Sequence, residues 1–224
     1  MRLSDFPPYT GLTYTYQSVC NLVMDSTRQP DLTRQRILEA GFAEIHRHGF
    51  QAASVANILA DTGLTKGALY HHFPSKKELG LAVVDEMIGI GLVERFVRPL
   101  RDAAHPAQAL IELIGMKQGN SEEFIRLGCP LNNLMQEMSP VDEEFRNRLN
   151  RLLSQWQEAF EEALRRAQIA GEIRGEVNCH AAALFIVSAW EGCTGVAKNM
   201  QSVEAFRACM SQLQGYVVSL LKTS

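Results

Sequence analysis

The sequence predicts an all-α protein, and three observations carry this prediction. Apolar residues recur at helical spacing through most of the 224 residues. Helix start signals (Ser, Thr or Asn) and stop signals (Gly or Pro) separate these periodic stretches. No strand-like alternation, internal repeat or low-complexity tract appears in the sequence. We therefore expect a helical chain that is long enough to bury a substantial core.

The first part of the chain predicts three helices. One is expected over residues 31–48, and two short helices follow it. Ser54 is a good N-cap for the first of these, Gly63 supplies the positive φ of a tight turn, and Thr65 can cap the second, residues 66–72. Two short helices around such a turn are the helix-turn-helix signature, although any two short helices joined by a glycine would look similar. The outer side of the second helix carries small residues and hydrogen-bond donors suited to phosphates and base edges: Thr65, Lys66, Gly67, Ala68, Tyr70 and His71.

The helical period continues to the end of the chain. Ser75 and Glu78 form a capping box, so a helix is expected from Ser75 to about Val97, with Pro99 ending it. Further helices are expected over residues 106–117, 122–126, 131–138, 139–170, 178–200 and 202–221, the fourth of them capped by Ser139. The helix from residue 178 is apolar nearly all round, so it must be covered on all sides, either within one subunit or by a second copy.

The N-terminal region resembles the DNA-binding domain of TetR-family transcriptional regulators. The resemblance runs from Thr33 to Glu86 and is carried by residues 33–40, 48–50, 54–60, 63–73 and 75–79, above all by the run Leu-Tyr-His-His-Phe followed by Ser-Lys. It implies a helix-turn-helix DNA-binding domain over residues 31–80 and a helical domain over residues 81–224 for effector binding and dimerisation. Residues 1–30 show no sustained period, so we expect a mostly disordered extension there. The first 23 residues are expected to be a misassigned start or a dispensable arm, because Met24 offers a second start.

What the resemblance implies about function is a cytoplasmic, homodimeric regulator, most often a repressor, that is paired through its last two helices. Its partners would be a palindromic double-stranded DNA operator and a small-molecule effector that releases it. The DNA-binding residues implied are Arg34, Ser54, Thr65, Lys66, Gly67, Ala68, Tyr70, His71 and Lys76. Residues from several helices would line the effector pocket, although each of them alone is more often a core residue: Met87, Phe96, Met116, Met135, Trp156, Phe160 and Trp190.

Cys129 is a candidate sensor thiol. The segment 128–134, followed by Glu137, resembles the TetR branch that includes the repressor of N-ethylmaleimide reductase, in which a cysteine senses electrophiles. A cysteine before a helix start, with Arg126 nearby, would have its thiolate favoured by the helix dipole. The alternative is a small buried side chain at a helix entry. Covalent modification at Cys129 therefore competes with reversible ligand binding, and an architectural DNA-binding protein without an inducer is a further alternative.

Composition excludes several other classes of protein. The net charge of −3 divides into +1 for residues 31–80 (6 Lys/Arg, 5 Asp/Glu) and −4 for residues 81–224 (14 and 18), so basic groups lie where DNA would bind. Five cysteines without a Cys-x-x-Cys pair argue against a disulfide framework or a zinc site and for a reducing cytoplasm; Cys193 and Cys209 are expected in the core or the dimer interface. We expect no membrane span, no metal, no cofactor and no catalytic residue.

Overall fold

The structure is a computed structural model, and it describes residues 32–115 and 122–222. The extension over residues 1–30 and the expected pocket residue Met116 lie outside the described residues. The described residues form fourteen helical segments, and they contain no β-strand, only one isolated bridge between Ile173 and Leu221. The predicted all-α fold is confirmed.

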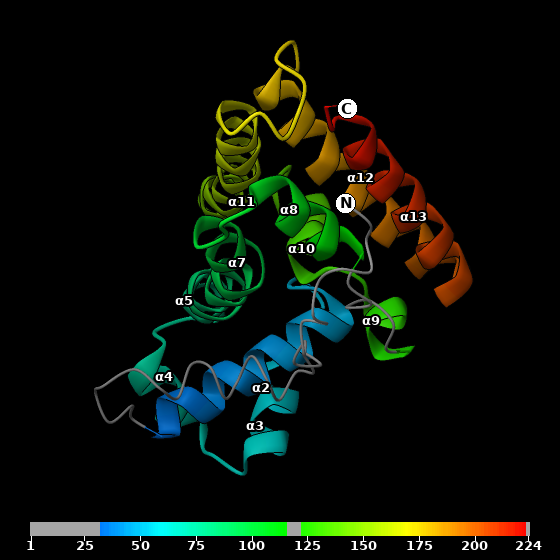
Figure 1. Cartoon of the computed structure of the whole chain (residues 1–224). Helices are drawn as coiled ribbons and strands as arrows, with labels where there is room; N and C mark the ends of the chain where they lie inside the picture. The colour runs from blue at the N-terminus through cyan, green and yellow to red at the C-terminus, as the bar shows by residue number, and fades with distance from the viewer. Residues whose placement is uncertain (1–31, 116–121, 223–224) are drawn as a thin grey trace.

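The helices form two units, a smaller one at the bottom of Figure 1 and a larger one above it. The lower unit, which we call the head, consists of α2 (Leu32–His48), α3 (Val55–Thr62) and α4 (Lys66–His72). A connecting helix leads from the head into the larger unit and is made of α5 (Lys76–Ala82), η2 (Val83–Gly89), α6 (Ile90–Leu92), η3 (Val93–Val97) and α7 (Arg98–Arg101). The larger unit contains α8 (Pro106–Gly115), α9 (Glu122–Leu127), α10 (Pro130–Met138), α11 (Glu143–Ile169), α12 (Cys179–Met200) and α13 (Val203–Ser219).

Most helix starts are where the sequence predicts them. The side chains of Ser75, Asn178 and Ser202 each accept a hydrogen bond from a backbone N–H in the first turn of α5, α12 and α13. The predicted start of α11 at Ser139 is wrong. Asp142 caps this helix instead, because its carboxylate accepts from the N–H groups of two first-turn residues, at 2.9 and 3.1 Å.

The connecting helix passes Pro99 rather than ending there. Pro99 lies in the first turn of α7, where its missing N–H is tolerated, and the π-helical segment η3 directly precedes that turn. A second π-helical segment, η2, lies where the connecting helix leaves the head. Because π-helical turns are uncommon and occur frequently at functional sites, both segments indicate that the connecting helix has a functional role.

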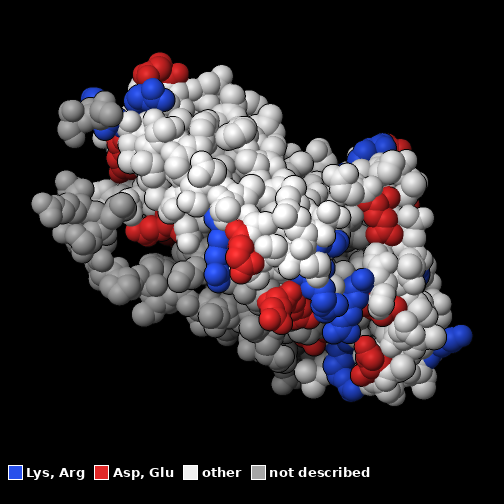
Figure 2. Space-filling model, turned by 90° about the vertical axis from the view of Figure 1, so that its right-hand side faces the viewer, with Lys and Arg blue, Asp and Glu red and all other residues white. Residues whose placement is uncertain are grey.

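One face of α12 and α13 is left uncovered. Leu184, Phe185, Val196 and Met200 of α12 and Val218 of α13 are 44–59% exposed. Figure 2 shows this side of the molecule as a broad surface with few charged residues. Among the described residues, α12 is the one helix that is long and apolar enough to cross a membrane, by length and composition alone, and half of its apolar window is buried inside the fold. A single chain therefore does not cover α12 on all sides, as its apolar sequence requires.

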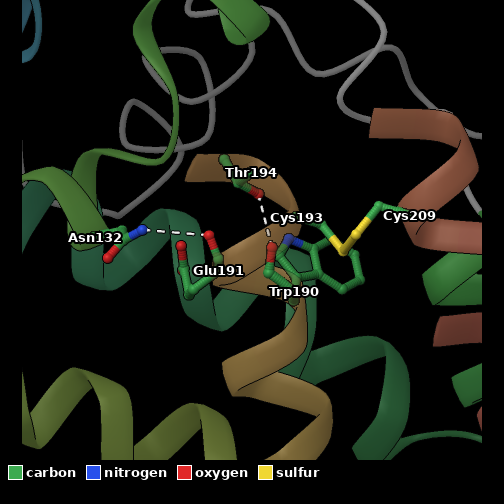
Figure 3. The surroundings of a disulfide bond; sticks show 6 residues. All are labelled: Asn132, Trp190, Glu191, Cys193, Thr194 and Cys209. Carbon is green, nitrogen blue, oxygen red and sulfur yellow. Dashed lines mark hydrogen bonds between the residues drawn. A yellow bond between two sulfur atoms is a disulfide. The ribbon is translucent and has the colours of Figure 1, made fainter. Parts of the chain in front are cut away.

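A disulfide joins α12 to α13. Cys193 is bonded to Cys209, with their Cα atoms 5.6 Å apart (Figure 3). Cys193 is buried, as expected, but the expectation that cysteines here form no disulfide is wrong for this pair. The two cysteines are 16 positions apart and form no motif, because helix packing rather than sequence spacing brings the two sulfurs together.

Candidate nucleic-acid interface and adjoining cavity

The head has helix-turn-helix geometry. Ser54 caps α3 by accepting from the N–H of Ala56, and Thr65 caps α4 by accepting from the N–H of Ala68, both at 3.2 Å. Gly63, with φ of 66°, makes the turn between the two helices. This left-handed conformation is one that glycine adopts without strain, so the sequence Thr-Gly-Leu folds locally into the tight turn that sets the angle of α4.

The two sides of α4 differ as predicted. Leu69 and Phe73 are buried against the rest of the head at 0% and 3% exposure. Thr65, Lys66, Gly67, Tyr70 and His71 are exposed, and Ala68 is half-buried. The outer side of α4 therefore offers small residues and hydrogen-bond donors to a groove of nucleic acid.

Three other residues of the predicted interface already have partners within the chain. The Arg34 guanidinium donates to both carboxylate oxygens of Glu86, at 2.7 and 2.5 Å. The Lys76 ammonium donates to the backbone carbonyl of Gln51 at 2.9 Å. Ser54 is occupied as the cap of α3, and its own N–H donates to a buried carboxylate of α2, that of Glu44. These three side chains are therefore engaged within the chain, whereas Lys66, Tyr70 and His71 of α4 are exposed.

A carboxylate of the larger unit holds the loop between α2 and α3. Glu137, in the last turn of α10, accepts hydrogen bonds from the backbone N–H groups of Phe50 and Gln51, both at 2.8 Å. Gly49 has φ of 80°, and a Cβ there would lie 2.8 Å from a Glu137 oxygen. Glycine is therefore required at position 49 for both backbone conformation and space. We call this contact the Glu137 latch.

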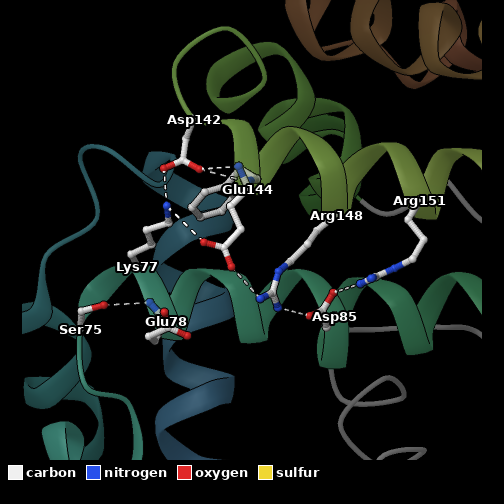
Figure 4. Close-up of polar contacts among 9 residues, drawn as sticks. Ser75, Lys77, Glu78, Asp85, Asp142, Glu144, Arg148 and Arg151 are labelled. Atoms are coloured by element: carbon white, nitrogen blue, oxygen red, sulfur yellow. Dashed lines mark hydrogen bonds and ion pairs between the residues drawn. The ribbon is translucent and has the colours of Figure 1, made fainter.

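A second set of contacts ties the connecting helix to α11 (Figure 4). Lys77 pairs with Asp142 at 2.8 Å and with Glu144 at 3.3 Å. Farther along, Asp85 pairs with both Arg148 and Arg151 of α11. Asp142 is also the cap of α11, and the pKa values of Asp142 and Glu144 are lowered, chiefly by hydrogen bonds from Lys77 and Arg148 respectively. The start of α11 therefore fixes the position of the helix that carries the head.

A mainly apolar cavity of about 250 Å³ lies above the head. Of the predicted pocket residues, Met87, Phe96 and Trp156 line it. Met135, Phe160 and Trp190 do not, although Phe160 and Trp190 pack against Phe96 in one aromatic cluster. The lining that sequence reasoning missed comes from α2, the connecting helix and the α9–α10 region, namely Phe42, Ala43, His46, Arg47, Ile88, Gly91, Leu92, Arg95, Glu123, Phe124, Leu127, Gly128, Pro130 and Leu131, together with Cys129.

Helix α2 of the head is thus part of the cavity wall. The imidazole Nε2 of His46 lies 2.9 Å from the carbonyl oxygen of Gly128, two residues before α10. Burial lowers the pKa of His46, with the Gly128 carbonyl acting in the opposite direction, so the ring is neutral and donates to that carbonyl. A larger and more open cleft of about 610 Å³ between α2 and α10 is lined by polar side chains such as Asn132, Gln136 and Lys198. The more apolar cavity is the better small-molecule site.

The environment of Cys129 differs from the one expected. The residue lines the cavity just before α10, but burial raises the pKa of its thiol well above the usual range, and the carboxyl group of Glu191 raises it further. The backbone N–H groups of Asn132 and Leu131 act in the opposite direction and are outweighed. The expectation that the helix dipole favours the thiolate is therefore wrong in its direction, because desolvation is the larger effect.

Glu191 is a buried acidic residue that the sequence did not predict. It is 7% exposed, and its carboxyl group lies beside the Cys129 thiol, whose hydrogen bond acts to lower the pKa of Glu191. Burial raises its pKa to about 7. A single acidic residue in an apolar helix gives no sequence signal that separates a buried carboxyl group from an exposed one.

Both the head and the larger unit match known protein families. Residues 37–83 match the family described as bacterial regulatory proteins, tetR family, and residues 100–213 match the tetracyclin repressor-like C-terminal domain. The HTH-type transcriptional repressor DhaR of Mycobacterium sp. is 28% identical over 166 residues, 71% of this chain and 79% of that protein. A TetR transcriptional regulator from Chloroflexus aurantiacus superposes with a TM-score of 0.75 at 25% identity, over 86% of this chain and 98% of that one.

The reduced form of E. coli NemR also has the same fold. Its TM-score is 0.72 at 19% identity, over 85% of this chain and 98% of that one, which shows likeness of fold alone. The proposed branch within the family is thus not established by this similarity. Members of the matched families are DNA-binding regulators rather than enzymes. Because the two family matches together span most of the described residues, the chain belongs to the TetR family of transcriptional regulators.

Proposed function

We propose that this protein is a cytoplasmic repressor that binds a palindromic operator as a homodimer and is released when a small molecule occupies the cavity between the head and the larger unit. The observation that supports release most directly is the position of α10. Its first turn borders the cavity through Pro130 and Leu131, and its last turn holds the head through the Glu137 latch. A ligand that displaces α10 would therefore act on the head directly.

The DNA contacts are proposed for the open side of α4. Lys66, Tyr70 and His71 would bind phosphates, while Thr65, Gly67 and Ala68 would approach base edges in the major groove. Ser54 and Lys76 would contact the backbone from the neighbouring helix starts. Arg34 would reach phosphate only after exchanging its carboxylate partner. Since one head carries a small net positive charge, two heads are needed for tight binding.

The homodimer is proposed to form through the uncovered faces of α12 and α13. The exposed apolar side chains on α12 alternate with small residues, and a Cβ added at Gly192 or Gly215 would meet nothing within 4 Å in the single chain. Such a surface lets helices of two subunits approach closely. Two-fold symmetry then places the heads on half-sites one helical turn apart, roughly 34 Å.

The cavity is proposed to control the spacing of the two heads. An effector shifts the equilibrium only by the difference between its affinities for the two arrangements of the dimer. The side chains that join the head to the cavity wall, Glu137 and His46, are the ones whose contacts would differ between these arrangements.

The experiment that tests this function is binding to the DNA upstream of the protein's own gene, followed by footprinting. We expect protection of two symmetric half-sites, and we expect Lys66→Ala to weaken binding to every sequence while Gln155→Ala, an exposed change on α11, does not. Equal affinity for unrelated DNA of the same length would contradict the repressor and favour an architectural DNA-binding protein.

A further inference from the structure

The polar cleft between α2 and α10 is a second space in the molecule, and the proposed function gives it no role. Its volume of about 610 Å³ lies within the range of roughly 300–1,000 Å³ that is usual for small-molecule sites. Its walls come from α2 of the head, from the connecting helix, and from α10 and α12 of the larger unit. A molecule that fills the cleft therefore contacts both units.

The charged side chains that line the cleft are mostly positive. Arg47 of α2 and Lys198 of α12 both line it. His48 lines it too, but its ring lies 3.7 Å from the carboxylate of Glu44, which offsets its charge. Among the described lining residues, Glu137 is the one carboxylate, and both of its oxygens accept hydrogen bonds in the Glu137 latch. The charge that remains for a ligand is positive, so the cleft favours an anion.

Neither of the two cations is paired with a carboxylate. Arg47 is exposed and has no hydrogen-bond or ion-pair partner within the described part of the chain. The Lys198 ammonium donates to the amide oxygen of Asn133 at 2.9 Å, and the Asn133 amide nitrogen donates to the carbonyl of Leu127 at 2.7 Å. These bonds fix the ammonium at the wall of the cleft through a neutral partner. The ammonium therefore keeps its charge and has further N–H groups to donate.

The charge of Lys198 also acts on the head. His46 of α2 lines the cleft, and its pKa is lowered first by burial and in smaller part by the positive charges of Lys198 and Arg126. The Gly128 carbonyl and the Glu123 carboxylate act in the opposite direction. A cation of the larger unit thus lies near enough to α2 to influence a side chain of that helix.

We propose that this cleft binds a small polar molecule with two negative charges, a phosphate monoester or a dicarboxylate, and that its oxygens contact both Arg47 of the head and Lys198 of α12. Guanidinium and ammonium groups bind such oxygens through charge-assisted hydrogen bonds. Because the two cations belong to different units, the bound anion holds the head against the larger unit beside the Glu137 latch. Binding at this site requires no DNA and no ligand in the apolar cavity.

Four probes test the class of ligand on the wild-type protein: glycerol 3-phosphate, glutarate, and their uncharged counterparts glycerol and glutaramide. Binding is measured by calorimetry at low ionic strength, without DNA. We expect at least one anion to bind about tenfold or more tightly than its uncharged counterpart, and the tighter anion identifies phosphate or carboxylate as the preferred group. Binding of both anions no tighter than that of the uncharged probes would overturn the proposal.

Arg47→Gln and Lys198→Gln each remove one charge and keep a hydrogen-bonding amide. We expect each variant to weaken the tighter anion about fivefold or more and to leave the uncharged probes unchanged. Arg165→Gln is the matched control, because Arg165 is an exposed cation on α11 that lines neither the cleft nor the apolar cavity. An equal loss in all three variants would mean that overall charge alone attracts the anion, and it would overturn the site.

Lys198→Gln also decides between the two spaces, because Arg47 lines both of them and Lys198 lines only the cleft. A loss in Arg47→Gln with full binding in Lys198→Gln would place the anion in the apolar cavity and overturn the proposal. Thermal unfolding without ligand shows whether Lys198→Gln keeps its fold. Arg47→Gln changes an exposed residue, so full anion binding by this variant would overturn the proposal by itself.

The anion site and the proposed function fail separately. If the anion binds as expected and the protein shows no preference for an operator, the site stands and the repressor function fails. If the operator is bound specifically and neither anion binds, the repressor function stands and the site fails.

Discussion

Cys193 of α12 and Cys209 of α13 are covalently joined across the two helices whose outer faces are left uncovered in the single chain. A cross-link that closes a loop of this length stabilises a fold by about 3 kcal/mol, mainly by restricting the unfolded chain. We therefore expect a reducing agent to lower the thermal midpoint by several degrees.

The measurement is thermal unfolding with and without reductant, with the thiol count taken by alkylation and mass spectrometry. Cys193→Ser should reproduce the reduced protein, and Cys179→Ser, at a free cysteine, should retain the response to reductant. An unchanged midpoint in a protein shown to be oxidised would mean that the bond constrains little beyond what helix packing already does.

Glu191 should make stability depend on pH with a definite sign. Its pKa is about 7 in the folded protein and 4.5 when unperturbed. Between these values the folded chain holds a proton that the unfolded chain releases, so the free energy of unfolding falls as pH rises, by about 1.4 kcal/mol per pH unit from this group. Glu191→Gln should remove this slope between pH 5 and pH 7, measured by denaturant unfolding against Glu162→Gln, an exposed change on α11. Equal slopes in both variants would show that Glu191 is not protonated on folding.

The pairing of Arg34 with Glu86 predicts a variant that binds DNA more tightly. Both side chains are more than a third exposed, so the pair contributes little to stability. Glu86→Gln frees the guanidinium and removes a negative charge beside the proposed interface. We expect tighter operator binding and a salt dependence steeper by about one ion, measured by anisotropy at several salt concentrations. Weaker binding would mean that the pair positions the head rather than competing with phosphate.

The Glu137 latch predicts a change in the tolerance for half-site spacing. Glu137→Gln removes the charge that strengthens two hydrogen bonds to the head, so the heads should be less firmly placed. Wild type should discriminate strongly between operators whose half-sites are one base pair closer or farther apart, and the variant should discriminate several-fold less. Gln136→Glu, a change on the exposed side of the same turn, is the control. Unchanged discrimination in Glu137→Gln would show that other contacts set the spacing.

Cys129 should react slowly with electrophiles. Burial keeps its thiol protonated at neutral pH, and the thiolate is the reactive form. We expect alkylation by N-ethylmaleimide, followed by peptide mapping, to be more than tenfold slower at Cys129 than for glutathione at the same pH. A rate at or above that of glutathione, together with DNA release that is lost in Cys129→Ser, would favour the alternative of covalent sensing.

What the sequence predicted well is what depends on neighbours along the chain. The caps at Ser54 and Thr65, the turn at Gly63 and the burial of Leu69 all follow from spacing and side-chain chemistry within a few residues. The start of α11 was misplaced because Ser139, Pro140 and Asp142 all carry start signals, and only the competition among them in three dimensions selects the last.

The features that went unpredicted join distant parts of the chain. Phe50 and Glu137 are separated by 87 positions, and a carboxylate bound to backbone N–H groups leaves no mark in the sequence of the loop. The same holds for His46, whose place in the cavity wall depends on how the head packs against α10. Helical periodicity identifies which side of α2 is apolar, but it does not tell what lies opposite.

The position of α10 between cavity and head has a thermodynamic consequence. If a ligand beside Pro130 lowers the affinity of the dimer for DNA by a given factor, then DNA lowers the affinity of the dimer for that ligand by the same factor. Operator DNA is then an antagonist of the ligand. Ligand affinities measured on the free protein would overestimate occupancy on DNA, and the difference between the two affinities gives the coupling free energy that passes through this one helix.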